Sequence, residues 1–476
     1  MTAKAMPFSK GEFQEEEDPQ EHLLFDPRPR EEMNKMVMES MRSTSGPFWV
    51  VVGVLTLVVL VCLVGAWLYM ALTGMGVAGV RRPTYWGMFI ANFVFWIGIS
   101  HAGTFVSAIL RVFKADFRRP FTRAAELMTA FGLVVAGMYP LIHLGRVWVA
   151  YWIIPYPNSR WLWPNLRSPL TWDMIAIFTY LLSSTLYLYL PLIPDVAMAR
   201  DHSNGWRYRL YRIMALGWRG TEAEWHRLRT AIQIFAFAII PVMFSVHTIV
   251  SWDFAVTKTP GWHSTIFGPF FVAGAIYSGV SAVVMILFLI RTTLANMKYF
   301  VRKEHFDALG KLVLVFSLTW TYFYFSEYIL AWYGGDLSDQ YVWNALTKGP
   351  YAWMWYIMLT CNIAVPCLTL WNRQIRRTPW MMFVIGFIVN LGMYIERYLI
   401  VPGMISRNRF PFTWDEYTPR IELVISVGSL SLFLLLYVLA SRLIPLIPVW
   451  EVHEGQIAHT LRRIGKTVVP TKSEIE

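Results

Sequence analysis

Residues 48–72 read FWVVVGVLTLVVLVCLVGAWLYMAL, a stretch without a single charged side chain. A helix rises about 1.5 Å per residue and the hydrocarbon core of a bilayer is about 30 Å thick, so such a stretch is long enough to span it. Nine further apolar runs follow along the chain. They predict an all-α integral membrane protein with about ten transmembrane helices, at 48–72, 85–113, 121–142, 169–194, 230–250, 267–293, 309–333, 351–371, 380–401 and 422–442.

The composition agrees with a membrane protein. Charged residues make up 15% of the 476 residues, against roughly 25% in soluble domains. The first apolar run begins only after some 45 polar residues, too late for a cleaved secretory signal. We therefore expect residues 1–47, with the acidic run Glu15–Asp18, to form a mostly disordered arm that can dock on a partner.

Lysine and arginine are divided unevenly between the two sides of the membrane. With alternating loops, the side of the N-terminus receives 31 of them and the other side 11. The positive-inside rule then predicts that both termini are cytoplasmic. The net charge of +11 needs no nucleic acid as a partner, because basic loops facing anionic membrane lipid account for it.

Loop lengths predict how the helices are grouped. Short loops favour two four-helix bundles, one at 85–255 and one at 267–401. The spans 48–72 and 422–442 are then peripheral, and residues 443–476 form a cytoplasmic tail. The polar, proline-rich segment from Arg146 to Pro169 is expected to cap the outer surface.

The three cysteines predict no redox centre in this chain. Cys62, Cys361 and Cys367 all lie in apolar runs, and none belongs to a C-x-x-C pair or a haem attachment sequence. An iron–sulfur cluster usually needs four thiolates. Neither a metal site nor a bound cofactor is therefore expected, and buried packing is the simplest interpretation of the cysteines.

Four ionisable side chains are expected near the outer face of the first bundle. His143 ends the third span, Asp173 lies near the start of the fourth, and His247 and Asp253 lie near the end of the fifth. Ionisable groups in spans are costly and usually functional. Quinol oxidation releases two protons with its two electrons, so imidazole and carboxylate bases beside an apolar approach fit that chemistry.

Simpler interpretations stand beside this one. Asp173 can be a helix N-cap, and a single histidine at a helix end is usually an interfacial hydrogen-bonding group. His143 and His247, at matching depth, can also ligate a haem, whereas His101 lies too deep to join them. The aromatic residues that can line an approach, but for which packing is the simpler interpretation, are Trp86, Phe89, Phe93, Phe95 and Trp96.

Other polar residues are expected at other depths in the membrane. Asp195 follows Asp173 by 22 residues, roughly 33 Å along a helix, so it is expected at the cytoplasmic surface with its neighbours Arg200 and Asp201. Glu396 is expected to pair with Arg397. The sequence leaves Glu327 open between such pairing and a place in a proton path.

Several segments resemble a known family. They are Arg123-Ala-Ala-Glu126, the stretch from Tyr139 to Arg146 with its H-L-G-R sequence, the stretch from Pro155 to Asp173 ending in R-S-P-L-T-W-D, and the stretch from Leu192 to Asp201. Together they resemble the NrfD/PsrC family of quinone-interacting membrane subunits, and most closely the ActC subunit of alternative complex III. The resemblance covers roughly residues 85–255, and the second bundle matches in layout only.

The resemblance implies menaquinol oxidation near the periplasmic face of a bacterial inner membrane. It implies His143, Asp173 and Asp253 as site residues, which we expect to be catalytic. We expect Arg146 and His247 to bind the quinone beside them. Electrons would pass to a periplasmic iron–sulfur subunit and then to c-type haem subunits, beside a paralogous ten-helix subunit that lacks the quinone site. The candidates for a proton path are His101, Glu126, Asp195 and Glu327.

Two other functions remain open from the sequence. A secondary transporter usually has helices broken near the bilayer centre, and Pro140, Pro191, Pro194 and Pro241 do lie in spans, but the ionisable cluster lies at one end. A cofactor-free membrane anchor would not need four converging ionisable groups.

Overall fold

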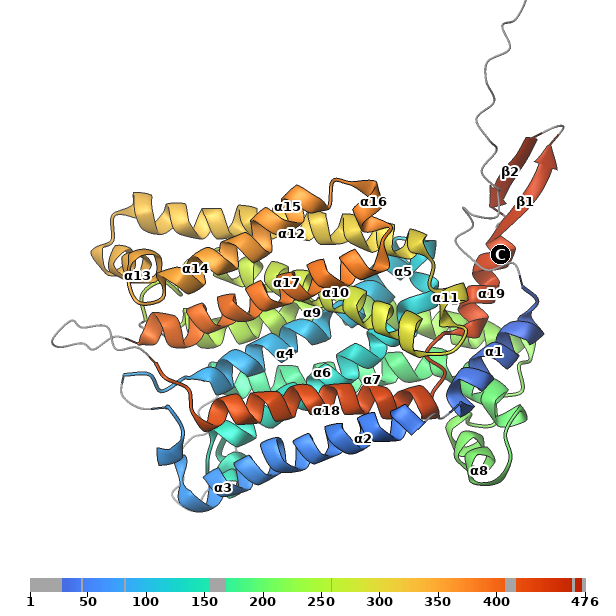
Figure 1. Cartoon of the computed structure of the whole chain (residues 1–476), viewed down its shortest axis with the longest axis horizontal. Coiled ribbons are helices and arrows are strands. Elements are labelled where there is room, and N and C mark those ends of the chain that lie inside the picture. Colours follow the sequence, from blue (N-terminus) through green and yellow to red (C-terminus); the bar gives the residue numbers. More distant parts are fainter. Residues whose placement is uncertain are drawn as a thin grey trace, which may run out of the picture.

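A computed structural model describes residues 28–43, 46–80, 83–153, 168–257, 259–406, 417–464 and 467–472. Within these ranges ten helices are long and apolar enough to cross a membrane, which confirms the ten predicted spans. Successive spans run in opposite directions, so helices α1 (Arg30–Arg42) and α19 (Val449–Ala458) lie at the same end of the bundle (Figure 1). We call it the α1 end, and the opposite end the α3 end.

The spans are built mostly of α-helix with short π-helical turns and, at the start of the third span, a 3-10 turn, and short helices connect them. The first five are α2 (Gly46–Val58) with η2 (Val59–Gly65) and α3 (Ala66–Thr73), α4 (Met88–Thr104) with η4 (Phe105–Ile109) and α5 (Leu110–Val112), η5 (Asp116–Phe121) with α6 (Thr122–His143), α7 (Pro169–Asp201), and α9 (Glu222–Ala255). The second five are α10 (Phe267–Thr293), α12 (Lys303–Gly334), α14 (Ala352–Leu359) with η7 (Thr360–Ala364) and α15 (Val365–Thr369), α17 (Pro379–Tyr398) with η8 (Leu399–Gly403), and α18 (Ile421–Leu443). The connecting helices are η3 (Met75–Val77), η6 (Val147–Ile153), α8 (Gly205–Met214), α11 (Met297–Phe300), α13 (Leu337–Lys348) and α16 (Arg373–Arg376).

Several helices continue beyond the apolar run that predicted them. Helix α9 begins at Glu222 because Thr221 and Glu224 form a capping box, in which the Thr221 hydroxyl accepts from the Glu224 amide (3.4 Å) and the Glu224 carboxylate accepts from the Thr221 amide (3.1 Å). Helices α7 and α9 run without a break through Pro191 and Pro241. They therefore lack the interruption that a transporter site uses.

Helix α4 lies at the centre of the molecule. It packs against α6, α10 and α17, while α7 packs along α9, and α10 also contacts α9, α12 and α17. Helix α18 packs along α2 and η2 at one side of the molecule (Figure 1). The division into two four-helix bundles stays a prediction, since α10 contacts helices of both.

The close approach of α4 to α6 depends on Gly103. A Cβ at this position would clash with the hydroxyl of Thr129 and the carbonyl oxygen of Ala125 on α6. We predict that Gly103→Val forces the two helices apart, at a cost of about 2 kcal/mol, and lowers the thermal unfolding midpoint in detergent. The control is Gly137→Val on α6, where a Cβ meets nothing within 4 Å. Equal midpoints for both variants would rule out this contact as a packing constraint.

Two terminal segments are more ordered than the sequence suggested. Residues 30–42, predicted as part of a disordered arm, form α1, which buries methionines such as Met33 and Met41 and packs against α18 and α19. In the predicted tail, α19 packs against α7 and η5. Strands β1 (His459–Ile464) and β2 (Thr467–Lys472) follow it as an antiparallel hairpin. The arm before residue 28 lies outside the described residues.

Candidate functional site

Asp173 and Asp253 form an acid pair at the α3 end. Asp173 lies on α7, four residues after Pro169, and Asp253 lies two residues before the end of α9. Their side chains are buried, at 6% and 8% exposure, and their charges interact. The Oδ1 atom of each has no hydrogen-bond partner among the described residues. The N-cap of α7 is Ser168, so Asp173 is not a helix cap, and its carboxylate is available as a base.

His143 and Arg146 lie at a sharp turn after α6. His143 is half-buried, its Nδ1 has no partner in the described part of the chain, and its ring lies 6.4 Å from that of Phe89 between centroids. Gly145 has φ +67°, and a Cβ there would press on the Met75 side chain. This turn explains the H-L-G-R sequence, because only glycine adopts this conformation without strain. The side chain of Arg146 is exposed.

An apolar groove runs between α7 and α9 beside the acid pair. It has about 580 Å³ of empty volume. Ala176 lies one turn after Asp173, and Ile249 lies one turn before Asp253, so the lining of the groove comes within one helical turn of both acidic residues. The side chains that line it are Trp172, Ile175, Ala176, Thr179, Val242, Ser245, Val246 and Ile249.

His247 lies deeper than the sequence suggested and meets His101. The two rings are 4.7 Å apart between centroids, so the expectation that His101 lies too deep to join His247 is wrong. His247 is six residues before Asp253, about 9 Å along α9, and no described contact joins it to His143. Both ring nitrogens of His247 lack a partner among the described residues, whereas those of His101 face the carbonyl oxygens of Ile97 (2.7 Å) and Met243 (3.0 Å).

Aromatic rings connect the acid-pair region with the second group of helices. Phe254, next to Asp253, contacts the rings of Trp86 (5.4 Å), Trp262 (5.0 Å) and Phe271 (5.7 Å). Of the aromatic residues considered from the sequence, Trp86 therefore reaches this region, and Phe89 reaches the ring of His143. Phe95 and Trp96 contact Tyr394 and Phe433 instead, so their role is interior packing.

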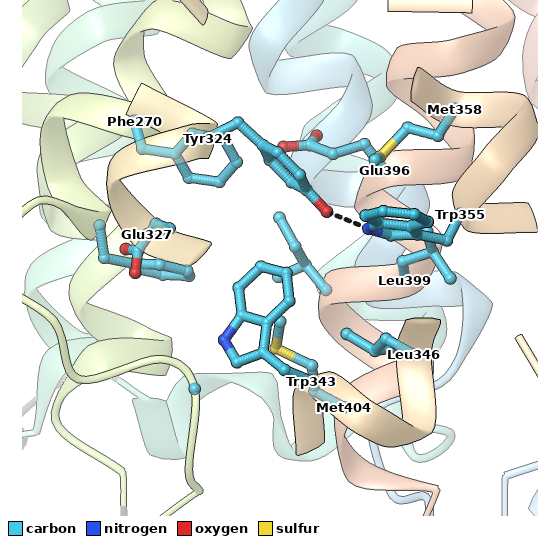
Figure 2. Close-up of a pocket in the computed structure, with 13 residues that line it drawn as sticks. Phe270, Tyr324, Glu327, Trp343, Leu346, Trp355, Met358, Glu396, Leu399 and Met404 are labelled. Carbon is cyan, nitrogen blue, oxygen red and sulfur yellow. Dashed lines mark hydrogen bonds between the residues drawn. The ribbon is translucent and has the colours of Figure 1, made fainter. Parts of the chain in front are cut away.

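A second pocket lies among α10, α12, α13, α14 and α17 (Figure 2). Its empty volume is about 390 Å³, of which about 20 Å³ admits the centre of a water molecule, room for one or two waters. The Tyr324 hydroxyl accepts from Trp355 Nε1 (2.7 Å), Ser264 donates to Glu327, and Glu396 pairs with Arg397 (3.2 Å). The predicted pairing of Glu396 is thus confirmed, and Glu327 faces a mostly apolar pocket that the sequence did not indicate.

The remaining proton-path candidates, Glu126 and Asp195, belong to an ion network near the α1 end. Arg123 donates to Asp195 (3.1 Å) and to the carbonyl oxygen of Pro191 (2.8 Å), and lies 3.6 Å from Glu126. Asp195 is 2% exposed, so its expected place at the surface is wrong, although Arg200 and Asp201 do pair there (2.8 Å). The reason is that Arg123 supplies a buried partner, which depth along one helix does not reveal.

Glu451 of α19 completes this end of the molecule. Its two carboxylate oxygens accept from Arg111 Nη2 and Arg118 Nη1, both at 2.7 Å. Trp450 Nε1 donates to the carbonyl oxygen of Pro191 on α7 (2.9 Å). The sequence contained no signal for these contacts, because more than 330 residues separate each arginine from Glu451.

The comparison with known proteins agrees with this architecture. Residues 76–406 match the family described as polysulphide reductase, NrfD. The chain belongs to the NrfD family. The matched range holds eight of the ten spans, those from α4 to η8, and the two peripheral spans, α2–α3 and α18, lie outside it.

Individual relatives of this NrfD-family chain are named as subunits of redox enzymes. It is 25% identical to a putative dimethyl sulfoxide reductase membrane subunit of Halobacterium salinarum over 85% of this chain and 92% of that protein. It is 22% identical to a selenate reductase subunit of Mesobacillus selenatarsenatis (79% and 90% covered) and 23% identical to an Hdr-like menaquinol oxidoreductase integral membrane subunit of Archaeoglobus fulgidus (80% and 89% covered). The closer resemblance to ActC stays a prediction.

Proposed function

We propose that this NrfD-family chain oxidises menaquinol at the acid pair and passes the electrons to an iron–sulfur partner docked at the α3 end. The observation that carries the proposal is the apolar groove between α7 and α9, whose lining comes within one helical turn of Asp173 and Asp253. A quinol needs a lipid-accessible apolar channel for its tail and bases at its ring hydroxyls. The Archaeoglobus relative, named as a menaquinol oxidoreductase subunit, supports the choice of substrate.

The quinol loses two electrons and two protons in this reaction and leaves as the quinone. Asp173 and Asp253 accept the protons from the ring hydroxyls, with His143 as a further acceptor at the same end. The electrons go to the oxidised iron–sulfur partner, because three separate cysteines provide too few thiolates for a cluster in this chain. From that partner they would continue to c-type haem subunits.

Charge supports the orientation that this proposal requires. With 31 of the 42 lysine and arginine residues assigned to the side of the α1 end, the positive-inside rule makes that end cytoplasmic. The α3 end, with the acid pair, then faces the periplasm of a bacterial inner membrane. Proton translocation stays a further prediction, since His101, the pair Glu126 and Asp195, and Glu327 lie in three separate groups.

Replacement of His143 tests the proposal. We predict that His143→Gln lowers menaquinol oxidation by the purified complex about a hundredfold and removes the limb of the pH profile that reports a titrating base. The control is His226→Gln, an exposed histidine near the start of α9. Normal turnover in His143→Gln would remove His143 from the site. Copurification of the chain without any iron–sulfur protein in mild detergent would overturn the proposed electron acceptor.

A further inference from the structure

A polar groove at the α1 end has no place in the proposed function. It lies where α7 ends and α8 begins, against the last turn of α1. It has about 540 Å³ of empty volume, and Arg42, Ser203, Asn204 and Arg207 line it. A neighbouring groove of about 870 Å³ shares Arg42 and adds Lys35 and His202. Three spans, α2, α7 and α18, begin or end here, so the grooves lie at the membrane surface.

The first groove contains donors without acceptors. Ser203 is 6% exposed, and its hydroxyl oxygen has no hydrogen-bond partner among the described residues. Arg207 Nη1 is likewise buried and unpartnered there. Helix α8 opens at this point with Asn204 as an N-cap whose side chain makes no capping hydrogen bond, and its first turn holds no acidic residue. Buried donors without acceptors are costly, and an uncapped helix N-terminus attracts anions.

Positive charge is concentrated around these donors. The charge of Arg207 interacts with that of Arg442 at the end of α18. Arg42 donates to the carbonyl oxygen of His202, and Arg442 donates to that of Ser40, so α1 is fixed across the groove. No ion pair between a described carboxylate and Lys35, Arg42, Arg207 or Arg442 offsets this charge.

The nearby carboxylates have other partners. Glu39, which lines the neighbouring groove, accepts from Asn296 Nδ2 (3.2 Å). Asp201 pairs with Arg200 (2.8 Å). The donors at the groove therefore lack an anion from the described chain.

Apolar side chains adjoin the same cations. Arg207 stacks on Trp206 (5.5 Å), and Arg442 stacks on Phe48 at the start of α2 (4.5 Å). Trp206 is 61% exposed, and Ile213, near the other end of α8, and Leu216, just after that end, are 74% and 69% exposed. An arginine-lined groove beside exposed apolar side chains at a membrane surface fits a phosphate that carries acyl chains.

We propose that this groove binds the phosphate group of an anionic phospholipid. Arginine binds phosphate through paired N–H donors, the Ser203 hydroxyl and the first amides of α8 supply further donors, and the exposed side chains of α8 contact the acyl chains. The site is independent of the proposed quinol chemistry. A soluble phosphate is the other source of the same chemistry, and the experiment separates the two.

The test is lipid binding by the full chain with its native partners. Native mass spectrometry would measure retention of dioleoylphosphatidylglycerol, with dioleoylphosphatidylcholine as the zwitterionic comparison. We predict that R42Q/R207Q weakens retention of the anionic lipid about tenfold and that Ser203→Ala weakens it less. The control R209Q/R212Q removes the same charge from exposed positions on α8 and is expected to change retention less than twofold.

Three outcomes would overturn the proposal. Equal losses in both double variants would show only a general effect of surface charge. Equal retention of the two lipids by the unaltered protein would show that the anionic headgroup is not recognised. Displacement of the anionic lipid by millimolar inorganic phosphate would assign the groove to a soluble ligand. If R42Q/R207Q does not assemble, Ser203→Ala decides: weaker retention of the anionic lipid would support the proposal, and unchanged retention would overturn it.

Discussion

Asp173→Asn is expected to lower menaquinol oxidation about a thousandfold while the complex assembles normally. The amide has nearly the shape of the carboxylate but cannot accept a proton from a quinol hydroxyl. Asp173 Oδ1 has no hydrogen-bond partner among the described residues, so no described contact through that atom is lost. The charges of Asp173 and Asp253 interact, and removing one of two like charges relieves repulsion. Stability is therefore expected to stay the same or rise.

A loss of turnover without a loss of stability separates a catalytic role of Asp173 from a structural one. Turnover would be measured with a menaquinol analogue and an artificial acceptor, and the unfolding midpoint would be measured on the same sample. The matched control is Asp201→Asn at the other end of α7, where the side chain is 60% exposed. A variant at position 173 that turns over within twofold of the unaltered protein would disprove the assignment. A loss of both activity and assembly would point to a structural role.

The sequence predicted the spans because the hydropathy of a helix indicates whether lipid or water surrounds it. Every apolar run became a span, but helix ends such as Glu222 were missed. Polar residues outside the hydrocarbon extend a helix beyond its apolar run, and the helix begins where a cap such as Thr221 stands. Helices α1 and α19 were missed for another reason. Their buried faces meet partners distant in the chain, such as the contact of Glu451 with Arg111, and one sequence does not contain that pairing.

The candidate site was predicted in part. Depth along each helix correctly brought Asp173 and Asp253 to the same end, but depth does not give the direction in which a side chain points. Six residues separate His247 from Asp253, which corresponds to roughly 240° of rotation about α9. His247 therefore faces His101 in the interior, away from the position expected for a quinone ligand. The pocket around Tyr324 was missed because residues from five helices and their connections form it.

Glu451→Gln is expected to cause the largest loss of stability. The carboxylate is 1% exposed and accepts from Arg111 and Arg118 at 2.7 Å each. Without its charge, the buried guanidinium group of Arg118 and the half-buried one of Arg111 lose their counterion, and breaking such a buried pair typically costs about 3 to 5 kcal/mol. The unfolding midpoint should fall, and proteolysis after α19 should become faster. The control on the same helix is Glu454→Gln, whose side chain is 23% exposed, with an expected cost below about 1 kcal/mol.

The pH dependence distinguishes a lost charge from a packing defect. Burial alone would raise the pKa of Glu451, but Arg111 and Arg118 outweigh it and lower the pKa to about 2 from an ordinary 4.5. This difference corresponds to about 3 kcal/mol. Because the folded pKa is the lower one, the stabilisation is complete above the unfolded value and is lost as the pH falls toward 2. The gap in unfolding midpoint between the unaltered protein and Glu451→Gln should therefore stay constant from pH 8 to about pH 5.5 and shrink below it. A gap that is independent of pH down to pH 3 would mean that the variant disturbs packing and that the ion pair contributes little.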